Sequence, residues 1–155
     1  MGEADEVAGG SLLAPLRGPE VLGLLSMVRL GRVAYSHRAL PAVQIVSHVI
    51  DQGDIVFRCH GKPPVIPPGQ GGPVVLAYEA DDVDPEKFTG WRVTVTGLAK
   101  LVRRPQEVAR LNGLLPPWPV NGGGCRLVRL HPGMLSGYRF LGPGKRGQPC
   151  SSATS

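Results

Sequence analysis

The residues with the clearest chemical potential lie where a strand-like run ends near position 60. Arg58 is followed by Cys59, His60, Gly61 and Lys62. Two cations beside a glycine, at the exit of a strand, can receive an anion such as a phosphate group. The same spacing is also compatible with two solvated cations at a strand end, and the residues alone do not separate these interpretations.

The other reactive side chains form no recognisable catalytic or metal-binding set. His60 could raise the thiolate content of Cys59, but no third partner follows in the sequence. The three cysteines, Cys59, Cys125 and Cys150, lack the spacing of metal ligands. We therefore expect no metal site and no disulfide framework, and we expect a reducing cytoplasmic location.

Length and composition favour one domain of short strands joined by turns. The chain has 155 residues, with 22 glycines and 16 prolines placed between the apolar runs. No apolar run is long enough to span a membrane, and the acidic start does not resemble a secretory signal. The net charge is +5, and no acid follows Glu107. This basic C-terminal part could serve nucleic acid or a phosphorylated ligand, or could be a solvated face.

Hydrophobic periodicity predicts a mainly β domain over residues 19–141, a small barrel or sandwich with flanking helices. We expect a flexible leader over 1–18 and a disordered tail over 142–155. Gly53 should occupy a tight turn and Gly97 a bulge or bend, while five prolines exclude a helix over 62–73. The predicted helices are 19–28 and 105–115, and the predicted strands are 31–36, 41–50, 55–59, 74–79, 91–102, 126–131 and 134–141.

The order of these runs resembles one family of proteins. The motifs are LGRVAYS (30–36), VIDQGDIVFR (49–58), YEADDVDPEKFTGWRVTVTGLA (78–99), the Pro-Trp pair at 117–118 and RLVRLHPGMLSGYRF (126–140). Together they are similar to the pyridoxamine 5'-phosphate oxidase-like family, over about residues 19–141. The resemblance implies a split β-barrel that binds FMN at the interface of a homodimer. Some members bind deazaflavin or haem instead.

The resemblance also implies an activity and a set of site residues. Members transfer hydride to or from the flavin, so the implied partners are a small-molecule substrate or a nicotinamide cofactor. Arg58 would hold the FMN phosphate, with Cys59, Gly61 and Lys62 beside it. The remaining expected cofactor contacts are Val46, Ser47 and His48 at the isoalloxazine ring, Trp91 and Arg92 near the phosphate, and Trp118, Tyr138 and Arg139 reaching the partner subunit's flavin.

Several of these residues have plainer interpretations. His48 could hydrogen-bond the flavin edge or bind haem, but a lone histidine on a strand is more often a satisfied interior residue. Trp91 and Trp118 could pack in a core as readily as they could stack on a flavin. Nucleic-acid binding is not expected, because the sequence lacks aromatic residues interleaved with clustered cations.

Two departures from the family pattern support a second hypothesis. Cys59 stands where a Thr or Ser usually follows the phosphate-binding Arg, and a thiol is a weaker hydrogen-bond donor. The proline-rich segment 62–73 replaces a helix that usually braces the phosphate. The alternative is therefore a split-barrel dimer that has lost its cofactor site and acts as a binding or accessory protein.

Overall fold

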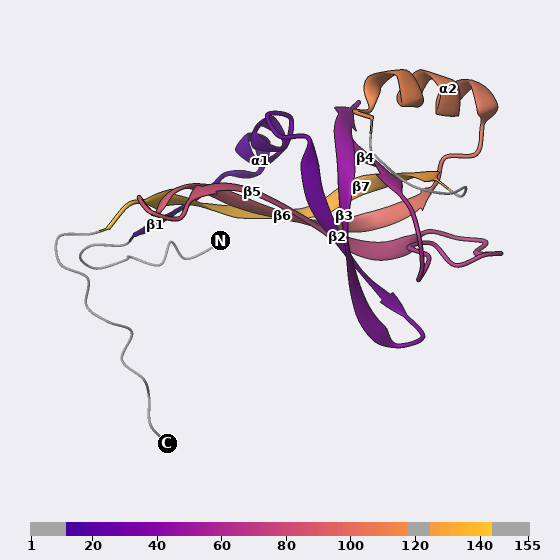
Figure 1. Cartoon of the computed structure of the whole chain (residues 1–155), viewed down its shortest axis with the longest axis horizontal. Coiled ribbons are helices and arrows are strands. Elements are labelled where there is room, and N and C mark those ends of the chain that lie inside the picture. The colour runs from indigo at the N-terminus through magenta and orange to yellow at the C-terminus, as the bar shows by residue number, and fades with distance from the viewer. Residues whose placement is uncertain (1–11, 118–124, 144–155) are drawn as a thin grey trace.

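Alternating apolar and polar side chains form long antiparallel strands in the computed structural model, which describes residues 12–117 and 125–143 (Figure 1). The element order confirms a mainly β fold with two short helices. The elements are β1 (Leu13–Pro15), α1 (Gly18–Leu25), β2 (Leu30–His37), β3 (Leu40–Asp51), β4 (Asp54–Cys59), β5 (Val74–Asp84), β6 (Thr89–Leu101), α2 (Pro105–Leu114) and β7 (Arg126–Leu141).

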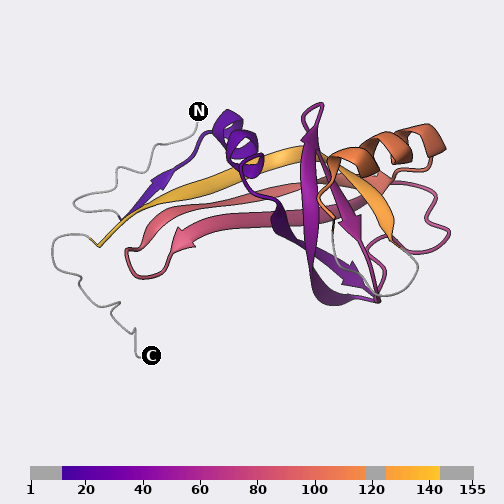
Figure 2. The ribbon, with the colours of Figure 1, turned by 45° about the horizontal axis from the view of Figure 1, so that its top comes forward.

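Strand β7 closes the sheet into a barrel. The strands lie in the order β1-β7-β4-β3-β2-β5-β6, and β7 also pairs with β6. Six strands therefore form a closed ring among the described residues, and closure removes the exposed sheet edges. β5, β6 and β7 continue beyond the ring as an arm, comprising residues 80–93, residues 136–141 and β1 (Figure 2). α2 lies at the opposite end of the molecule (Figure 1).

The structure confirms the turn and the bulge that the glycines predict. Gln52 and Gly53 both have positive φ in the tight turn between β3 and β4. The register between β6 and β7 shifts at Gly97, where a Cβ atom would clash with the carbonyl oxygen of His131. The prediction of separate strands 126–131 and 134–141 is wrong, because Gly133 is absorbed as a bulge within one continuous β7.

The structure adds a strand that the sequence analysis did not predict. β1 pairs antiparallel with the end of β7, with Leu13 opposite Phe140. It lies within residues 1–18, for which we expected a flexible leader. Residues 1–11, and residues 144–155 of the expected tail, lie outside the described part of the chain.

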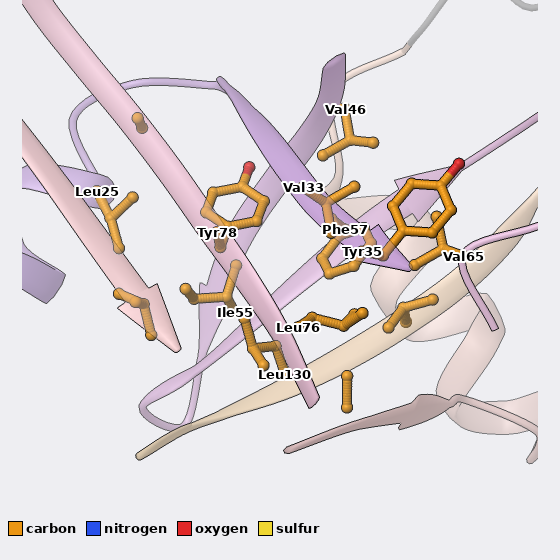
Figure 3. Packing of buried hydrophobic residues seen from close by; sticks show 14 of the residues in the cluster. Leu25, Val33, Tyr35, Val46, Ile55, Phe57, Val65, Leu76, Tyr78 and Leu130 are labelled. Carbon is orange, nitrogen blue, oxygen red and sulfur yellow. The ribbon is translucent and has the colours of Figure 1, made fainter. Parts of the chain in front are cut away.

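Two hydrophobic clusters occupy the two sides of the barrel wall. The larger cluster fills the barrel (Figure 3), and the smaller one lies between the wall and α2, around Val56, Leu111 and Leu127. The proline-rich segment contributes Val65 and Ile66 to the larger cluster, so it fills one end of the barrel. The Tyr35 hydroxyl donates a hydrogen bond of 2.7 Å to the Pro63 carbonyl and fixes this segment.

A network of ion pairs fastens α2 to the barrel. The Arg129 guanidinium lies 2.8 Å from a carboxylate oxygen of Asp51, 3.2 Å from Asp54 and 2.8 Å from Glu107. Arg110 of α2 forms a second bond to Asp51, at 2.9 Å. Hydrogen bonds from Arg110 and Arg129 lower the pKa of Asp51 far below its ordinary value. Arg129 thus joins β3, β4 and α2 through one planar cation.

Inside the barrel, His48 is a neutral, fully hydrogen-bonded residue. Its Nε2 donates to the Leu25 carbonyl at 2.8 Å, so Nδ1 accepts from the Tyr78 hydroxyl at 2.5 Å. Burial lowers the pKa of His48. Both ring nitrogens have protein partners, which joins α1, β3 and β5 through one side chain.

The ion-pair network makes a quantitative prediction. Replacing Arg129 with alanine leaves three carboxylates without their shared, largely buried partner, so the free energy of unfolding should fall by about 3 kcal/mol. Arg32→Ala is the matched control, since Arg32 also bonds two carboxylates, Glu79 and Asp81, but is half exposed. Its loss should cost less than about 1 kcal/mol. Urea unfolding measures both, and equal losses would contradict the assigned role of Arg129.

His48 predicts a dependence of stability on pH. The folded chain keeps the ring neutral, whereas the unfolded chain binds a proton below about pH 6.5, the ordinary pKa of histidine. The free energy of unfolding should therefore fall as pH decreases from 7.5 to 5.5, and the melting temperature should fall with it. A His48→Asn variant should lose this part of the slope. Parallel slopes for the two proteins would show that His48 does not titrate differently on unfolding.

Candidate functional site

Arg58 faces α2 because side chains alternate across β4. Phe57 and Cys59 point into the barrel cluster, so Val56 and Arg58 point outward. The Arg58 Nη2 atom donates a hydrogen bond of 3.0 Å to Oδ1 of Asn112 on α2. Its Nη1 atom also donates a long hydrogen bond of 3.5 Å to the Pro116 carbonyl, and together the two bonds orient the guanidinium group beneath the helix.

Arg58 lines a hollow that contains three arginines. The hollow has a volume of about 480 Å³ and lies between α2, the end of β6 and the start of β7. Arg58, Arg103, Arg126 and Asn112 supply its polar lining, and none of its lining residues is acidic. We call it the arginine pocket. Three guanidinium groups around one concavity favour an anion, and a partly enclosed site strengthens each charge interaction.

Ser47 is a second polar residue on the same face. It lies directly opposite Arg58 in the pairing of β3 with β4, which places the two Cβ atoms roughly 5 Å apart. Ser47 is fully buried, and its hydroxyl has no hydrogen-bond partner among the described residues. Ser47 does not itself line the arginine pocket, but buried polar groups are rarely left unpaired, so an orphaned hydroxyl opposite Arg58 fits a site for a polar ligand.

The structure places the neighbours of Ser47 inside the barrel. Val46 is fully buried in the larger cluster, and both ring nitrogens of His48 are already bonded. Neither side chain lines the arginine pocket. Among the three residues predicted to border a flavin ring, only Ser47 faces outward with Arg58.

The predicted pair of Arg58 and Lys62 does not share a pocket. Lys62 lines a second hollow of about 330 Å³, together with Cys59, Gly61 and the proline-rich segment. Burial raises the pKa of Cys59 to about 11, and its thiol donates to the Arg126 carbonyl at 3.3 Å. Arg126 lines both hollows, so this arginine stands between the two predicted phosphate contacts.

A third group of predicted residues lies on the arm. Trp91 is opposite Arg139, and Arg92 is opposite Tyr138, in the pairing of β6 with β7. Leu101, which lines the arginine pocket, is nine residues further along β6 than Arg92, or roughly 30 Å. One chain therefore does not bring these four residues to Arg58. This differs from our expectation that Trp91 and Arg92 would lie near the phosphate. Trp118 lies outside the described residues.

Sequence reasoning missed three residues of the arginine pocket. Arg103 and Asn112 reach it from the two ends of the segment that includes α2, and Arg126 reaches it from β7. The sequence signals were the Arg103-Arg104 pair directly after a strand and the acid-free, basic part after Glu107, which includes Arg126. Their convergence depends on β7 pairing with both β4 and β6, which no local pattern reveals.

Comparisons with known proteins agree with this architecture. Residues 18–139 match the family model described as pyridoxamine 5'-phosphate oxidase. The chain is 40% identical over 125 residues to the Mycobacterium tuberculosis protein Rv0080, covering 79% of this chain and 82% of that protein.

Two solved structures show the same fold. One is a Corynebacterium glutamicum protein assigned as a pyridoxamine 5'-phosphate oxidase, with a TM-score of 0.68, 26% identity, and coverage of 86% of this chain and 97% of that one. The other is the FAD binding protein of Mycobacterium smegmatis, with a TM-score of 0.63, 26% identity, and coverage of 82% and 98%. Because a family model matches most of its length and its fold is a split barrel, this chain belongs to the pyridoxamine 5'-phosphate oxidase family.

Proposed function

We propose that the protein is a flavin-dependent oxidoreductase that binds FMN with the phosphate in the arginine pocket. The observation that carries the proposal is the meeting of Arg58, Arg103 and Arg126 in a hollow that no carboxylate lines. The unpartnered Ser47 hydroxyl beside Arg58 adds to it. Family membership and a flavin-binding neighbour in Mycobacterium smegmatis support flavin as the ligand class.

Each residue of the pocket would have a distinct task. A bound flavin supplies hydride transfer to or from a small-molecule substrate or a nicotinamide cofactor. Arg58, already oriented by Asn112, would neutralise the phosphate at little cost in side-chain entropy. Ser47 would offer its free hydroxyl, while Val46 and His48 would contribute only backbone groups. His48 has no free ring nitrogen for an iron ion, which favours flavin over haem at this residue.

We further propose a homodimer formed through the outer face of the barrel. Val43, Ile45, Val75, Leu98 and Met134 are all large apolar residues that remain exposed on outward-facing strand positions. A soluble monomer rarely exposes such a face. In a dimer, the arm of one subunit could bring Arg92, Tyr138 and Arg139 to the arginine pocket of the other, whereas the Trp91 side chain is buried in the larger cluster of its own subunit.

The two described cysteines of the chain, Cys59 and Cys125, are free thiols, and this supports the proposed cytoplasmic location. Among the described residues, no helix has the length and apolar character needed to cross a bilayer.

One observation favours a second candidate function. The proline-rich segment buries Val65 and Ile66 at the barrel end, and Lys62 lies apart from Arg58. A family member in which the two expected phosphate-binding cations are separated in this way could act as a dimeric binding or accessory protein without a cofactor. FMN titration separates this candidate from the first.

FMN binding should depend on Arg58. Titration of the purified full chain, followed by quenching of flavin fluorescence, should give saturable binding. Arg58→Ala should weaken it by roughly ten- to a hundredfold, the loss expected for one charge-assisted hydrogen-bonding group. Arg38→Ala removes an exposed cation in the turn between β2 and β3 and should leave the affinity unchanged.

Two outcomes of the FMN titration would contradict the proposal. No saturable binding by the wild-type protein would support the accessory function instead. A loss with Lys62→Ala but not with Arg58→Ala would move the phosphate to the second hollow. The absorbance spectrum of the protein as purified distinguishes FMN from deazaflavin and haem.

The proposed dimer predicts an oligomeric state and its loss on mutation. Light scattering during gel filtration should give twice the chain mass of 16.4 kDa. Val43→Glu places a charge on the exposed apolar face of β3 and should shift the protein toward monomer, because an unpaired charge is costly to bury. Val43→Thr keeps the β-branched shape and should remain largely dimeric. A wild-type monomer, or an unaffected Val43→Glu dimer, would exclude this interface.

A further inference from the structure

A larger cleft adjoins the arginine pocket and has no role in the function proposed above. Its volume is about 750 Å³, and it lies between residues 70–73 of the proline-rich segment and the chain between β6 and α2. Leu101, Val102 and Arg103 line both this cleft and the arginine pocket. The two hollows are therefore neighbours that share one wall.

Three cations of the cleft have no partner. Lys100, Arg103 and Arg104 all line it, and the structure gives their side chains no ion pair or hydrogen bond to any described residue. Three other arginines, Arg32, Arg110 and Arg129, each bond a carboxylate. In contrast to these three, no described carboxylate neutralises Lys100, Arg103 or Arg104.

The single acid of the cleft does not neutralise these cations. Glu107 lies 2.8 Å from Arg129, so its carboxylate belongs to the ion-pair network beneath α2. The remaining lining carries three positive charges within five consecutive residues. A concave surface with walls of low dielectric focuses such a field, and the mutual repulsion of the cations is relieved when an anion binds.

The opposite wall supplies backbone donors. Gly71 and Gly72 line the cleft, and the structure records no hydrogen bond for their N–H groups. Open space surrounds both residues where a side chain would stand, so a ligand can approach the backbone closely. Cationic side chains on one wall and free amides on the other suit a multiply charged phosphate better than a single carboxylate.

We propose that this cleft is a second anion site, which binds the diphosphate of a nucleotide-like co-substrate next to the arginine pocket. Only the role of the bound ligand as a co-substrate rests on the proposed function. The anion site itself is independent of flavin. Arg103, which lines both hollows, would contact both ligands. The proximity of the sites would hold a phosphorylated co-substrate beside the flavin.

Calorimetric titration of the full chain with pyrophosphate and with ADP tests the proposal. Both should bind, and the affinity should fall as salt increases. The double variant Lys100→Ala/Arg104→Ala changes only residues outside the arginine pocket. It should weaken pyrophosphate binding by roughly tenfold or more and leave the FMN titration unchanged. Arg58→Ala should do the reverse, and Arg38→Ala, which removes an exposed cation in the turn between β2 and β3, should alter neither.

Each alternative occupant gives a different result. Pyrophosphate binding that Arg58→Ala abolishes would place the anion in the arginine pocket and overturn the second site. No binding of either probe by a protein that binds FMN would also overturn it, while leaving the flavin proposal intact. Binding of pyrophosphate but not FMN would retain the anion site and reject the flavin. Tighter binding of a short single-stranded oligonucleotide, lost in the double variant, would reassign the cleft to nucleic acid.

Discussion

The double pairing of β7 is the constraint on which the rest of the structure depends. β7 lies between β4 and β6, so it closes the ring and leaves no unpaired edge there. The same pairing sets Arg126 opposite Cys59, next to Leu127, which lies opposite Arg58. It also places Arg129 at the turn between β3 and β4, beside its carboxylate partners Asp51 and Asp54. Barrel closure and the gathering of cations therefore have one origin.

The alternation of side chains along β4 decides which of its residues line which hollow. Successive side chains of a strand point to opposite faces, so Arg58 lies under α2 while Cys59 lies against the barrel interior. A cation and a thiol that are adjacent in sequence thus occupy different hollows. Arg126 lines both hollows and therefore connects the two sides of the barrel wall. This arrangement gives the ligand of the arginine pocket an outward, α2-facing position on the barrel wall.

Charge is distributed unevenly along the molecule. Acidic residues gather on the arm, at Asp81, Asp82, Asp84 and Glu86, and at the turn between β3 and β4. Around α2 the carboxylates of Asp51 and Glu107 form ion pairs with Arg110 and Arg129. The remaining cations there form no ion pair with a described residue. Neutralised cations fasten the helix, and unneutralised ones line the hollows beside it. Stability and anion binding therefore draw on different arginines of the same region.

The sequence by itself determined the local features of this protein. Period-two alternation predicted most strands, Gly53 and Gly97 predicted a turn and a bulge, and the ordered motifs led to the family. It also identified Arg58 as a cation at a strand exit. The sequence could not reveal β1, which is too short to show a period, or the continuity of β7 through Pro132 and Gly133.

Tertiary structure alone decided how the site is composed. It separated Lys62 from Arg58, placed His48 in the core, and joined Arg103, Asn112 and Arg126 around one pocket. The reason is physical: the face that a strand residue presents, and the neighbours it meets, follow from register and barrel closure between segments far apart in the chain.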